Sequence, residues 1–522
     1  MPSRTNTDEP HAPLRLDGAF TRLTFDDWQR AAEATLKAPR IFETLAKKTL
    51  DGIPVEALYD RSSTTERWVP AFDETRPMPV RNRRDWDSRL SIRSTDAGSA
   101  NREALQGLRG GIRSLELRVG AGREALPLKA LGEVLAGVHL DMVSVSLLDD
   151  GNTIHALDAL VDLCRERKLD PRTLQASLNA DPIGALARLG ASANVSSGSA
   201  GIDGAFENMG ETAKRAAADM PLAFAVTSDL SIHHEAGATT VQELVAGIAS
   251  ATRQLEHLLG AGLEPAAAAR TLLFRVSLDA NIVDGIVKLR ALERLWRHVL
   301  SQFDNQGVPV VAPTVVAETS RRHLSVLEPW VNHLRNIAAC TAAAIADAET
   351  IIVHPHNLVG GCVVGDDTDT AERVARNLPL LLAEEAGLRD VADAAGGSHA
   401  IEALTQATVE AVWSGLGELE SEGGLIGALE SGRWQASLAR THAERVERLR
   451  TGTDIRVGVN RYRAADAGSL EAAIGSPTGD PAETTPGADS MTPDEDSQPL
   501  DNKLPRVREA HAFEAVSRET PE

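Results

Sequence analysis

The chain has 522 residues, of which 42% are hydrophobic, 25% charged and 3% aromatic, so we expect a soluble globular protein with a core of mainly Ala, Val, Leu and Ile. A formal net charge of −21 leaves no basic excess to neutralise phosphates, which argues against nucleic-acid binding. The three cysteines lack a C-x-x-C spacing, and the sequence shows neither an apolar leader nor about 18 consecutive apolar residues. The composition therefore predicts a cytoplasmic protein without disulfides and without a membrane span.

Residues 1–85 are expected to form an extension that packs on another surface. A helix capped by Thr24 is predicted to end near Leu36, and a second helix is predicted around Ile41–Thr49. The remaining stretch contains prolines and arginines and is expected to be irregular.

Residues 86–455 alternate short β-branched runs with longer Ala- and Leu-rich stretches, a pattern typical of repeated βα units around a parallel sheet. No G-x-G-x-x-G follows the first strand, and the strands are evenly interleaved with helices. The pattern therefore favours an α/β fold of the closed (β/α)8 TIM barrel type over an open Rossmann sheet. An eighth, weak strand is predicted near Asp390–Ala394. The seven clear strands are expected at Ser114–Val119, Met142–Leu148, Thr173–Leu178, Leu222–Thr227, Leu272–Ser277, Val308–Val316 and Ile351–Val353. The helices are expected at Thr153–Arg167, Thr240–Leu259, Ile282–Gln302, Trp330–Ala346 and Thr370–Ala386.

Residues 456–522 are expected to form a linker and a disordered acidic tail. From Ala464 to Glu522 there are 13 acidic residues, 4 basic residues and seven prolines, with little apolar periodicity. Such a segment buries too little surface to offset its ordering entropy. Only a short helix at Val507–Ser517 is predicted within it.

The segment after the strand Leu222–Thr227 is the richest in groups that could carry chemistry, because functional residues of barrels gather where strands end. His233, His234 and Glu235 could transfer protons or bind a metal ion. Adjacent side chains diverge, however, so the two histidines are not expected to share a ligand. The alternative is a structural loop in which Gly237 makes the turn, Glu235 braces it and the histidines line it.

Two further groups follow later strands. His354 and His356 have the H-x-H spacing that places two imidazoles on one side of an extended segment, as in barrel metallohydrolases. Partner ligands after other strands are not evident, so a loop lining is the alternative. The run Arg321-Arg322-His323 could meet a CoA phosphate or lie in a solvated loop.

The chain resembles the methylmalonyl-CoA mutase family. Residues Glu235–Leu244 read Glu-Ala-Gly-Ala-x-x-x-Gln-Glu-Leu, as the loop and helix of that family do. Further family-like motifs occur in the same order along the chain, which makes the resemblance specific. They are Asp51–Ile53, Leu58-Tyr59, Trp86 with Arg89, Lys288–Trp296, Glu328–Arg335, Ala375–Asn377 and Asp393–Ser398.

The resemblance also shows where catalytic groups are missing. The family's catalytic subunit carries a Tyr-His pair two residues before the Glu-Ala-Gly-Ala run, and Ser231 and Ile232 stand at those positions. An isoleucine cannot donate a hydrogen bond or carry a proton. The family's Gln-Asn-Asp run is represented by Asn179-Ala-Asp181, with fewer polar groups where the CoA ester would lie. The resemblance thus implies the small, non-catalytic subunit type, without catalytic residues. The candidate pocket-lining residues are Asn179, Asp181, His233, His234, Glu235, His354 and His356.

The resemblance implies a heterodimer in which a large subunit binds adenosylcobalamin and interconverts methylmalonyl-CoA and succinyl-CoA. In the catalytic version of the family, an Asp-x-His-x-x-Gly loop supplies the histidine that ligates cobalt. None of the 14 histidines here has an aspartate two places before it, and only the acidic tail follows Arg463. We therefore expect no cofactor or metal to be bound by this chain alone, acyl-CoA to be a further candidate ligand, and residues 1–85 to clamp the partner.

Two other interpretations remain open on the sequence. One is an independently active barrel enzyme, either a mutase barrel that uses a separate cobalamin-domain protein or a metal-dependent hydrolase using His354 and His356. The other is a protein without enzymatic activity that binds acyl-CoA or a mutase partner.

Overall fold

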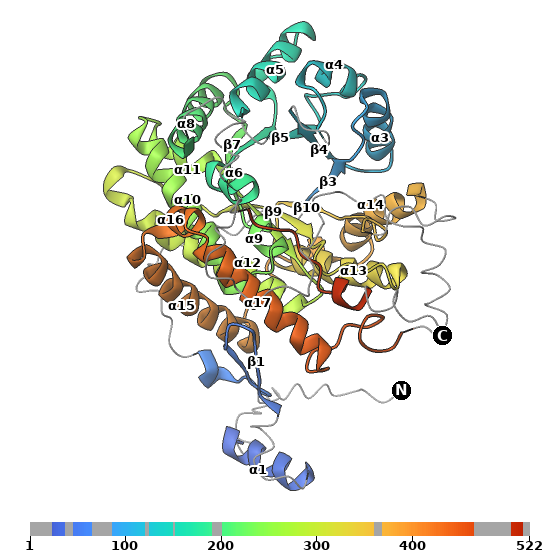
Figure 1. Cartoon of the computed structure of the whole chain (residues 1–522), viewed down its shortest axis with the longest axis vertical. Helices are drawn as coiled ribbons and strands as arrows, with labels where there is room; N and C mark the ends of the chain where they lie inside the picture. Colours follow the sequence, from blue (N-terminus) through green and yellow to red (C-terminus); the bar gives the residue numbers. More distant parts are fainter. Residues whose placement is uncertain are drawn as a thin grey trace, which may run out of the picture.

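A computed structural model shows a closed barrel of eight parallel strands surrounded by helices (Figure 1). This confirms the (β/α)8 prediction. The structure describes residues 23–36, 45–64, 86–120, 125–149, 152–190, 201–359, 368–463 and 503–514. Around the barrel the strands follow chain order, and the last strand closes on the first. They are β3 (Asp87–Ile92), β4 (Ser114–Val119), β5 (Ser144–Asp149), β6 (Ala176–Ala180), β7 (Phe224–Asp229), β8 (Leu272–Leu278), β9 (Thr314–Thr319) and β10 (Thr350–Ile352).

Helices connect the strands and cover the outside of the barrel, with α15 packed against α10 and α12. Their apolar faces meet the outward side chains of the strands, as where Phe274 on β8 contacts Trp296 on α12 edge to face. The helices from the first strand onward are α3 (Ala97–Arg109), α4 (Leu131–Val134), α5 (Thr153–Glu166), α6 (Pro182–Leu189), α8 (Gly201–Asp219), α9 (Ser231–Glu235), α10 (Thr240–Gly260), α11 (Pro265–Arg270), α12 (Ile282–Gln302), α13 (Pro329–Ile345), α14 (Thr368–Glu384), α15 (His399–Ser421), α16 (Gly424–Glu430) and α17 (Arg433–Arg450).

Seven of the predicted strands are confirmed, although β9 begins later than predicted, at Thr314. The prediction of a strand near Asp390–Ala394 was wrong, because the chain there forms a 3-10 turn, η6 (Leu388–Asp390), and further turns. The eighth strand is β3, which pairs with both β4 and β10. β3 reads Asp-Ser-Arg-Leu-Ser-Ile and contains no apolar run that a sequence search would find. Arg89 is nevertheless buried there, because it bonds to Ser114 on β4.

The inside of the barrel has an apolar layer and, nearer the carboxyl ends of the strands, a charged layer. In the charged layer Arg275 on β8 donates two hydrogen bonds to Glu116 on β4, at 2.6 and 3.1 Å. β4 and β8 stand four places apart in a ring of eight strands, so this ion pair joins opposite walls of the barrel. Glu318 on β9 also accepts a hydrogen bond from Arg275. The apolar layer contains Leu273, Val316 and Ile352.

Only part of the N-terminal extension stands apart from the barrel, because Asp51 accepts hydrogen bonds from Thr239 and Val241 at the start of α10 and Ile53 joins the main core. The predicted first helix is confirmed as α1 (Phe25–Leu36), and none of its residues is buried. Figure 1 shows α1 below the barrel, beyond a hairpin of β1 (Lys47–Lys48) and β2 (Pro54–Val55). The second predicted helix was therefore wrong at Lys47–Lys48, because these residues pair with β2 across a turn; residues 41–44 lie outside the described residues.

Residues 503–514 depart from the prediction of a disordered tail. The Leu504 N–H donates to a carbonyl of α6 at 2.8 Å and the Val507 N–H donates to a carbonyl of α9 at 2.7 Å, so the segment crosses the carboxyl end of the barrel. The composition of the tail did not predict this ordered segment, because ion pairs rather than buried apolar area hold it in place. The buried Glu509 pairs with three arginines of other elements, Arg322, Arg445 and Arg456. The remainder of the tail, residues 464–502 and 515–522, lies outside the described residues.

Candidate functional site

The two histidines lie on α9, a short helix at the carboxyl end of β7, where the sequence predicted a loop. Gly237 then turns the chain toward α10 with a φ of +101°, and a Cβ at this position would lie 2.8 Å from the Cβ of His442 on α17. Glycine is needed there for both the backbone conformation and the close approach. Thr239 begins α10 with a capping box, in which its side chain and that of Gln242 each accept a backbone N–H of the other.

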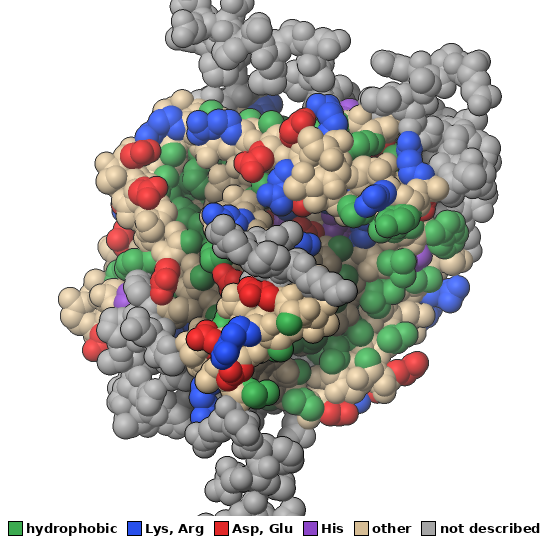
Figure 2. Space-filling model, turned by 90° about the horizontal axis from the view of Figure 1, so that it is seen from below, with side chains coloured by type: hydrophobic (Ala, Val, Ile, Leu, Met, Phe, Trp, Pro, Cys, Tyr) green, Lys and Arg blue, Asp and Glu red, His purple; other side chains and the backbone are tan. Residues whose placement is uncertain are grey.

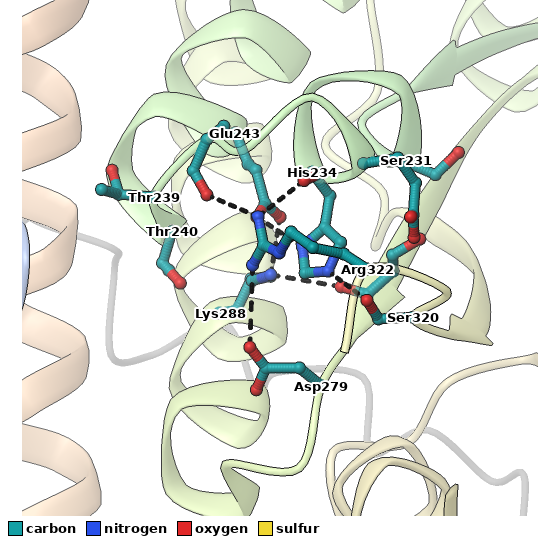
Figure 3. A network of polar contacts seen from close by, with 12 residues as sticks. Ser231, His234, Thr239, Thr240, Glu243, Asp279, Lys288, Ser320 and Arg322 are labelled. Carbon is teal, nitrogen blue, oxygen red and sulfur yellow. Dashed lines mark hydrogen bonds and ion pairs between the residues drawn. The ribbon is translucent and has the colours of Figure 1, made fainter. Parts of the chain in front are cut away.

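His234 is fully enclosed in a polar network (Figure 3). Its Nδ1 lies 2.6 Å from Oε1 of Glu243, and its Nε2 lies 2.8 Å from the hydroxyl of Ser320. The other carboxylate oxygen of Glu243 accepts a hydrogen bond of 2.6 Å from Lys288 Nζ. The network thus joins α9, α10, α12 and the end of β9.

The environment holds His234 neutral. Burial, followed by the nearby charges of Arg322 and Lys288, lowers its pKa well below the usual range. Because a carboxylate can only accept, we assign the ring proton to Nδ1, facing Glu243, which leaves Nε2 to accept from the Ser320 hydroxyl. Both ring nitrogens are therefore engaged inside the protein.

Arg322 connects this network to neighbouring backbone and acids. It donates to the carbonyls of His234 and Ala238 at 2.6 and 2.9 Å, and it lies 3.7 Å from the Asp279 carboxylate. Although burial opposes it, the Arg322 charge lowers the pKa of Asp279. Arg322, the middle residue of the predicted run Arg321-Arg322-His323, is therefore buried and has a structural role.

His233 points away from His234, as the divergence of adjacent side chains predicted. The indole N–H of Trp434 on α17 donates to its Nδ1 at 3.1 Å, and the two rings meet edge to face. Burial lowers the pKa of His233 to about 4, so its ring is neutral at pH 7. His233 fastens α17 over the end of the barrel.

Glu235 faces the loop after β9. Its carboxylate accepts the Arg321 N–H at 3.0 Å, and burial raises its pKa to about 7. Glu235 therefore braces one loop against another, which is the role that the structural interpretation of the sequence gave it.

His354 and His356 do not converge. His354 lies 3.5 Å from Glu318 of the barrel interior, whereas His356 stacks on Trp330 and packs against His333, with ring centroids 4.8 and 4.0 Å apart. Within the described ranges, no group of three His, Cys, Asp or Glu side chains is placed to hold a metal ion. This geometry gives no support to the metallohydrolase interpretation.

Comparison with known proteins agrees with the resemblance. A family model described as methylmalonyl-CoA mutase matches residues 120–515. The chain belongs to the methylmalonyl-CoA mutase family. The methylmalonyl-CoA mutase small subunit of Streptomyces virginiae is 32% identical over 467 residues, which cover 87% of this chain and 72% of that protein. The small subunit of Propionibacterium freudenreichii subsp. shermanii is 29% identical over 476 residues, covering 88% and 71%. That of Porphyromonas gingivalis is 26% identical over 468 residues, covering 86% and 71%.

In this chain, the side chains at the two positions of the family's Tyr-His pair are engaged in packing and capping. The Ser231 hydroxyl donates to Asp229 at 2.5 Å. The Ile232 side chain packs against α6, where a Cβ on Gly184 would come within 2.8 Å of its Cδ1. Neither side chain presents a free polar group for a thioester.

Asn179 and Asp181, which occupy the mutase Gln-Asn-Asp region, are likewise engaged. Asn179 adopts a φ of +55°, and its amide group bonds Ser146, Thr227 and two backbone carbonyls. Asp181 caps α6 and accepts a hydrogen bond from Gln254 at 3.0 Å, while burial raises its pKa to about 6. These residues hold β6, β7 and α10 together.

Sequence reasoning missed the residues that cross the inside of the barrel. Glu116 and Arg275 stand inside strands with apolar neighbours on both sides, and Glu318 follows the apolar run Val315–Ala317 near the end of β9. A charge at such a position is a usable signal, because an unpaired charge is rarely buried. Which charges would meet across the barrel depends on strand register, which the sequence does not provide.

Proposed function

We propose that this chain is the small subunit of a heterodimeric, adenosylcobalamin-dependent methylmalonyl-CoA mutase, and that catalysis takes place in the partner large subunit. Relatives named as small subunits support the assignment, since they align with most of this chain. In the proposed assembly, residues 1–85 contact the partner, residues 86–455 form the barrel and residues 456–522 form the linker and tail.

The observation that carries the non-catalytic role is the ion pair across the barrel. Arg275 bonds Glu116 on the opposite wall and Glu318 on the neighbouring strand, so an acyl-CoA chain along the barrel axis would have to break a buried charge cluster. Breaking such a cluster without replacing its partners costs about 3–5 kcal/mol. Ile232, in place of a proton-carrying histidine, supports the same role.

The histidines of α9 do not fit a role in holding adenosylcobalamin. The cofactor supplies radical chemistry when bound, and its cobalt takes a histidine ligand in the catalytic version of the family. On α9, both ring nitrogens of His234 are engaged, and His233 is buried against Trp434. We therefore assign the cofactor to the partner.

The N-terminal helix α1 supports a protein partner. Its apolar face carries Phe25, Trp28 and Leu36, and Phe25 and Leu36 remain 42% and 53% exposed. Water-exposed apolar helix faces gain most by packing on another surface. We propose that this face of α1 clamps the large subunit.

Surface charge, helix hydropathy and cysteine usage bear on whether the chain binds nucleic acid, crosses a membrane or is cytoplasmic. On the face shown in Figure 2, acidic and basic side chains are intermixed, which, with the net charge of −21, supports the exclusion of nucleic acid as a partner. No helix in the described ranges is long and apolar enough to cross a membrane. A cytoplasmic location remains a prediction from cysteine usage, and the described Cys164 and Cys340 are free.

Co-expression with a mutase large subunit from the same genome tests the assembly. We expect a stable 1:1 complex in size-exclusion chromatography with light scattering, and isomerase activity only in that complex. Phe25→Asp should weaken the complex at least about tenfold, because it buries an unpaired charge. The matched control Ala34→Asp adds the same charge to the opposite face of α1 and should leave binding unchanged. A chain that never associates with the large subunit would contradict the proposal.

Activity assays on the chain alone separate the remaining hypotheses. Without a partner, we expect no isomerisation after addition of adenosylcobalamin and a separate cobalamin-domain protein, and no bound metal by elemental analysis. The double substitution Ser231→Tyr and Ile232→His should also remain inactive alone, since it supplies no cofactor site. Turnover in any of these assays would show an independently active barrel.

A further inference from the structure

A cavity of about 30 Å³ lies at the carboxyl ends of β3 and β10, between the barrel and α14. This volume holds about two water molecules, so the cavity suits a small group and not an acyl-CoA. It is separate from the His234 network described above. Its charged lining comprises Arg89, Arg93, Arg321, Arg376, Glu103 and Glu372.

Four of these six groups have partners within the protein. Arg93 forms an ion pair with Glu372, and Glu103 accepts the backbone N–H of Arg93 at 3.1 Å. Arg89 donates from Nε to the Ser114 hydroxyl at 3.0 Å and lies 3.6 Å from Asp87. The remaining two residues, Arg321 and Arg376, have no such partner for their charge among the described residues.

Arg376 is only 8% exposed, and within the described ranges its guanidinium forms neither an ion pair nor a hydrogen bond; its buried Nε has no acceptor. The chain nevertheless makes room for it. A Cβ on Gly110, at the end of α3, would lie 2.6 Å from Arg376 Nε, so only a glycine lets the guanidinium lie where it does.

Arg321 lacks an acid partner as well. Its Nε lies 3.5 Å from His354 Nε2, at the outer limit of a hydrogen bond, and no carboxylate of a described residue lies within ion-pair distance of its guanidinium. The nearby Glu318 is already bonded by Arg275 and Ser277. Burial, followed by the charge of Arg506 on the crossing segment 503–514, lowers the pKa of Arg321. Glu318 and Glu235 act on Arg321 only from beyond ion-pair distance, so its buried charge has no direct acid partner among the described residues.

Two guanidinium groups lining one small cavity without acid partners call for an anion from solution, because burying unpaired charge is costly. We propose that a phosphate-type oxyanion binds in this cavity between Arg321 and Arg376. A tetrahedral phosphate presents acceptors in all directions and can meet planar guanidinium forks from two sides, whereas a carboxylate presents its two oxygens on one side. Bound there, phosphate ties α14 to the loop after β9.

The ligand is free inorganic phosphate or the terminal phosphate of a larger molecule. Both share the same chemistry, and calorimetric titration of the full chain with inorganic phosphate or with phenyl phosphate, at constant ionic strength, distinguishes them. Binding of phosphate alone identifies the free ion, and binding of both identifies a terminal phosphate. Binding of acetate in preference to phosphate would overturn the proposal.

Substitutions at the cavity test the site directly. Arg376→Gln should weaken phosphate binding at least about tenfold, the usual effect of losing a charged hydrogen bond. Arg376→Lys, which keeps the charge, should retain part of the affinity, and Gly110→Ala, which displaces the guanidinium, should weaken it. Arg373→Gln is the matched control, because Arg373 is exposed on the same helix and does not line the cavity.

The outcomes are distinct from those of the subunit proposal, because phosphate binding is measured on the chain without its partner. An affinity unchanged in folded Arg376→Gln protein, or no binding to the unsubstituted chain, overturns the site. Circular dichroism confirms that each variant is folded, and Arg376→Lys keeps the test valid if Arg376→Gln does not fold.

Discussion

The side chains of the α9 network and those of helix α1 differ in burial and in bonding. Around α9, the side chains of His234, Glu243 and Lys288 are buried and hydrogen-bonded to one another. On α1, apolar side chains such as Phe25 and Leu36 are exposed, and no residue of the helix is buried. In an independently active mutase barrel we would expect unengaged polar groups near α9. The contrast instead favours a rigid scaffold whose unsatisfied surface faces outward, toward a partner.

Glu243→Gln is expected to cause the largest loss of stability, because it leaves the buried Lys288 ammonium without its counter-charge. The free energy of unfolding, measured in urea, should fall by about 3–5 kcal/mol. Glu256→Gln on the same helix is the control: its ion pair with Arg253 is exposed, so its effect should stay within about 0.5 kcal/mol. Equal effects of the two substitutions would remove the distinction between the buried network and the surface.

Glu235 should make stability depend on pH. Its pKa rises from 4.5 in the unfolded chain to about 7 in the folded protein, so its stabilising contribution is full below pH 4.5 and is lost as pH rises through 7. At about 1.4 kcal/mol per pKa unit, the loss is about 3 kcal/mol. Urea unfolding of the native chain and of Glu235→Gln across pH 4–8 checks this. As pH rises, the free energy of unfolding of the native chain should fall relative to that of the glutamine variant. A constant difference would contradict the buried placement of the carboxyl group.

Trp434→Phe should have a smaller effect. It removes the N–H that the buried His233 Nδ1 accepts, and an unsatisfied buried acceptor costs about 1–3 kcal/mol. Adding His233→Leu removes that acceptor, so the double substitution should cost less than the sum of the two single ones in urea unfolding. Strict additivity would show that the contact does not fasten α17.

Phe25→Asp should have the smallest effect on the isolated chain, within about 0.5 kcal/mol, because Phe25 is exposed. Its effect on partner binding is expected to be large, as set out above. Thermal denaturation with and without the large subunit separates the two quantities. A marked loss of stability in the isolated chain would mean that α1 packs on its own barrel.

Much of the fold follows from periodicity, because alternating β-branched runs and long amphipathic stretches allow few arrangements other than βα repeats. Helix α12 was predicted with both ends correct, since Asn281 caps its start and the apolar spacing is continuous to Gln302. β3 was missed because its polar residues become buried only when Arg89 meets Ser114 on the next strand. Residues 503–514 were misjudged for a related reason, since Glu509 gains its partners from distant parts of the chain.

The sequence by itself determined the family and the absence of a histidine at Ile232, because motif order and residue identity need no coordinates. It also determined that His233 and His234 would diverge, since this follows from the geometry of adjacent residues. Only the tertiary structure decided that Arg275 reaches Glu116, and that Arg321 and Arg376 line one cavity while neither forms an ion pair with a described residue. Such pairings depend on strand register and helix placement, which bring together residues that lie far apart along the chain.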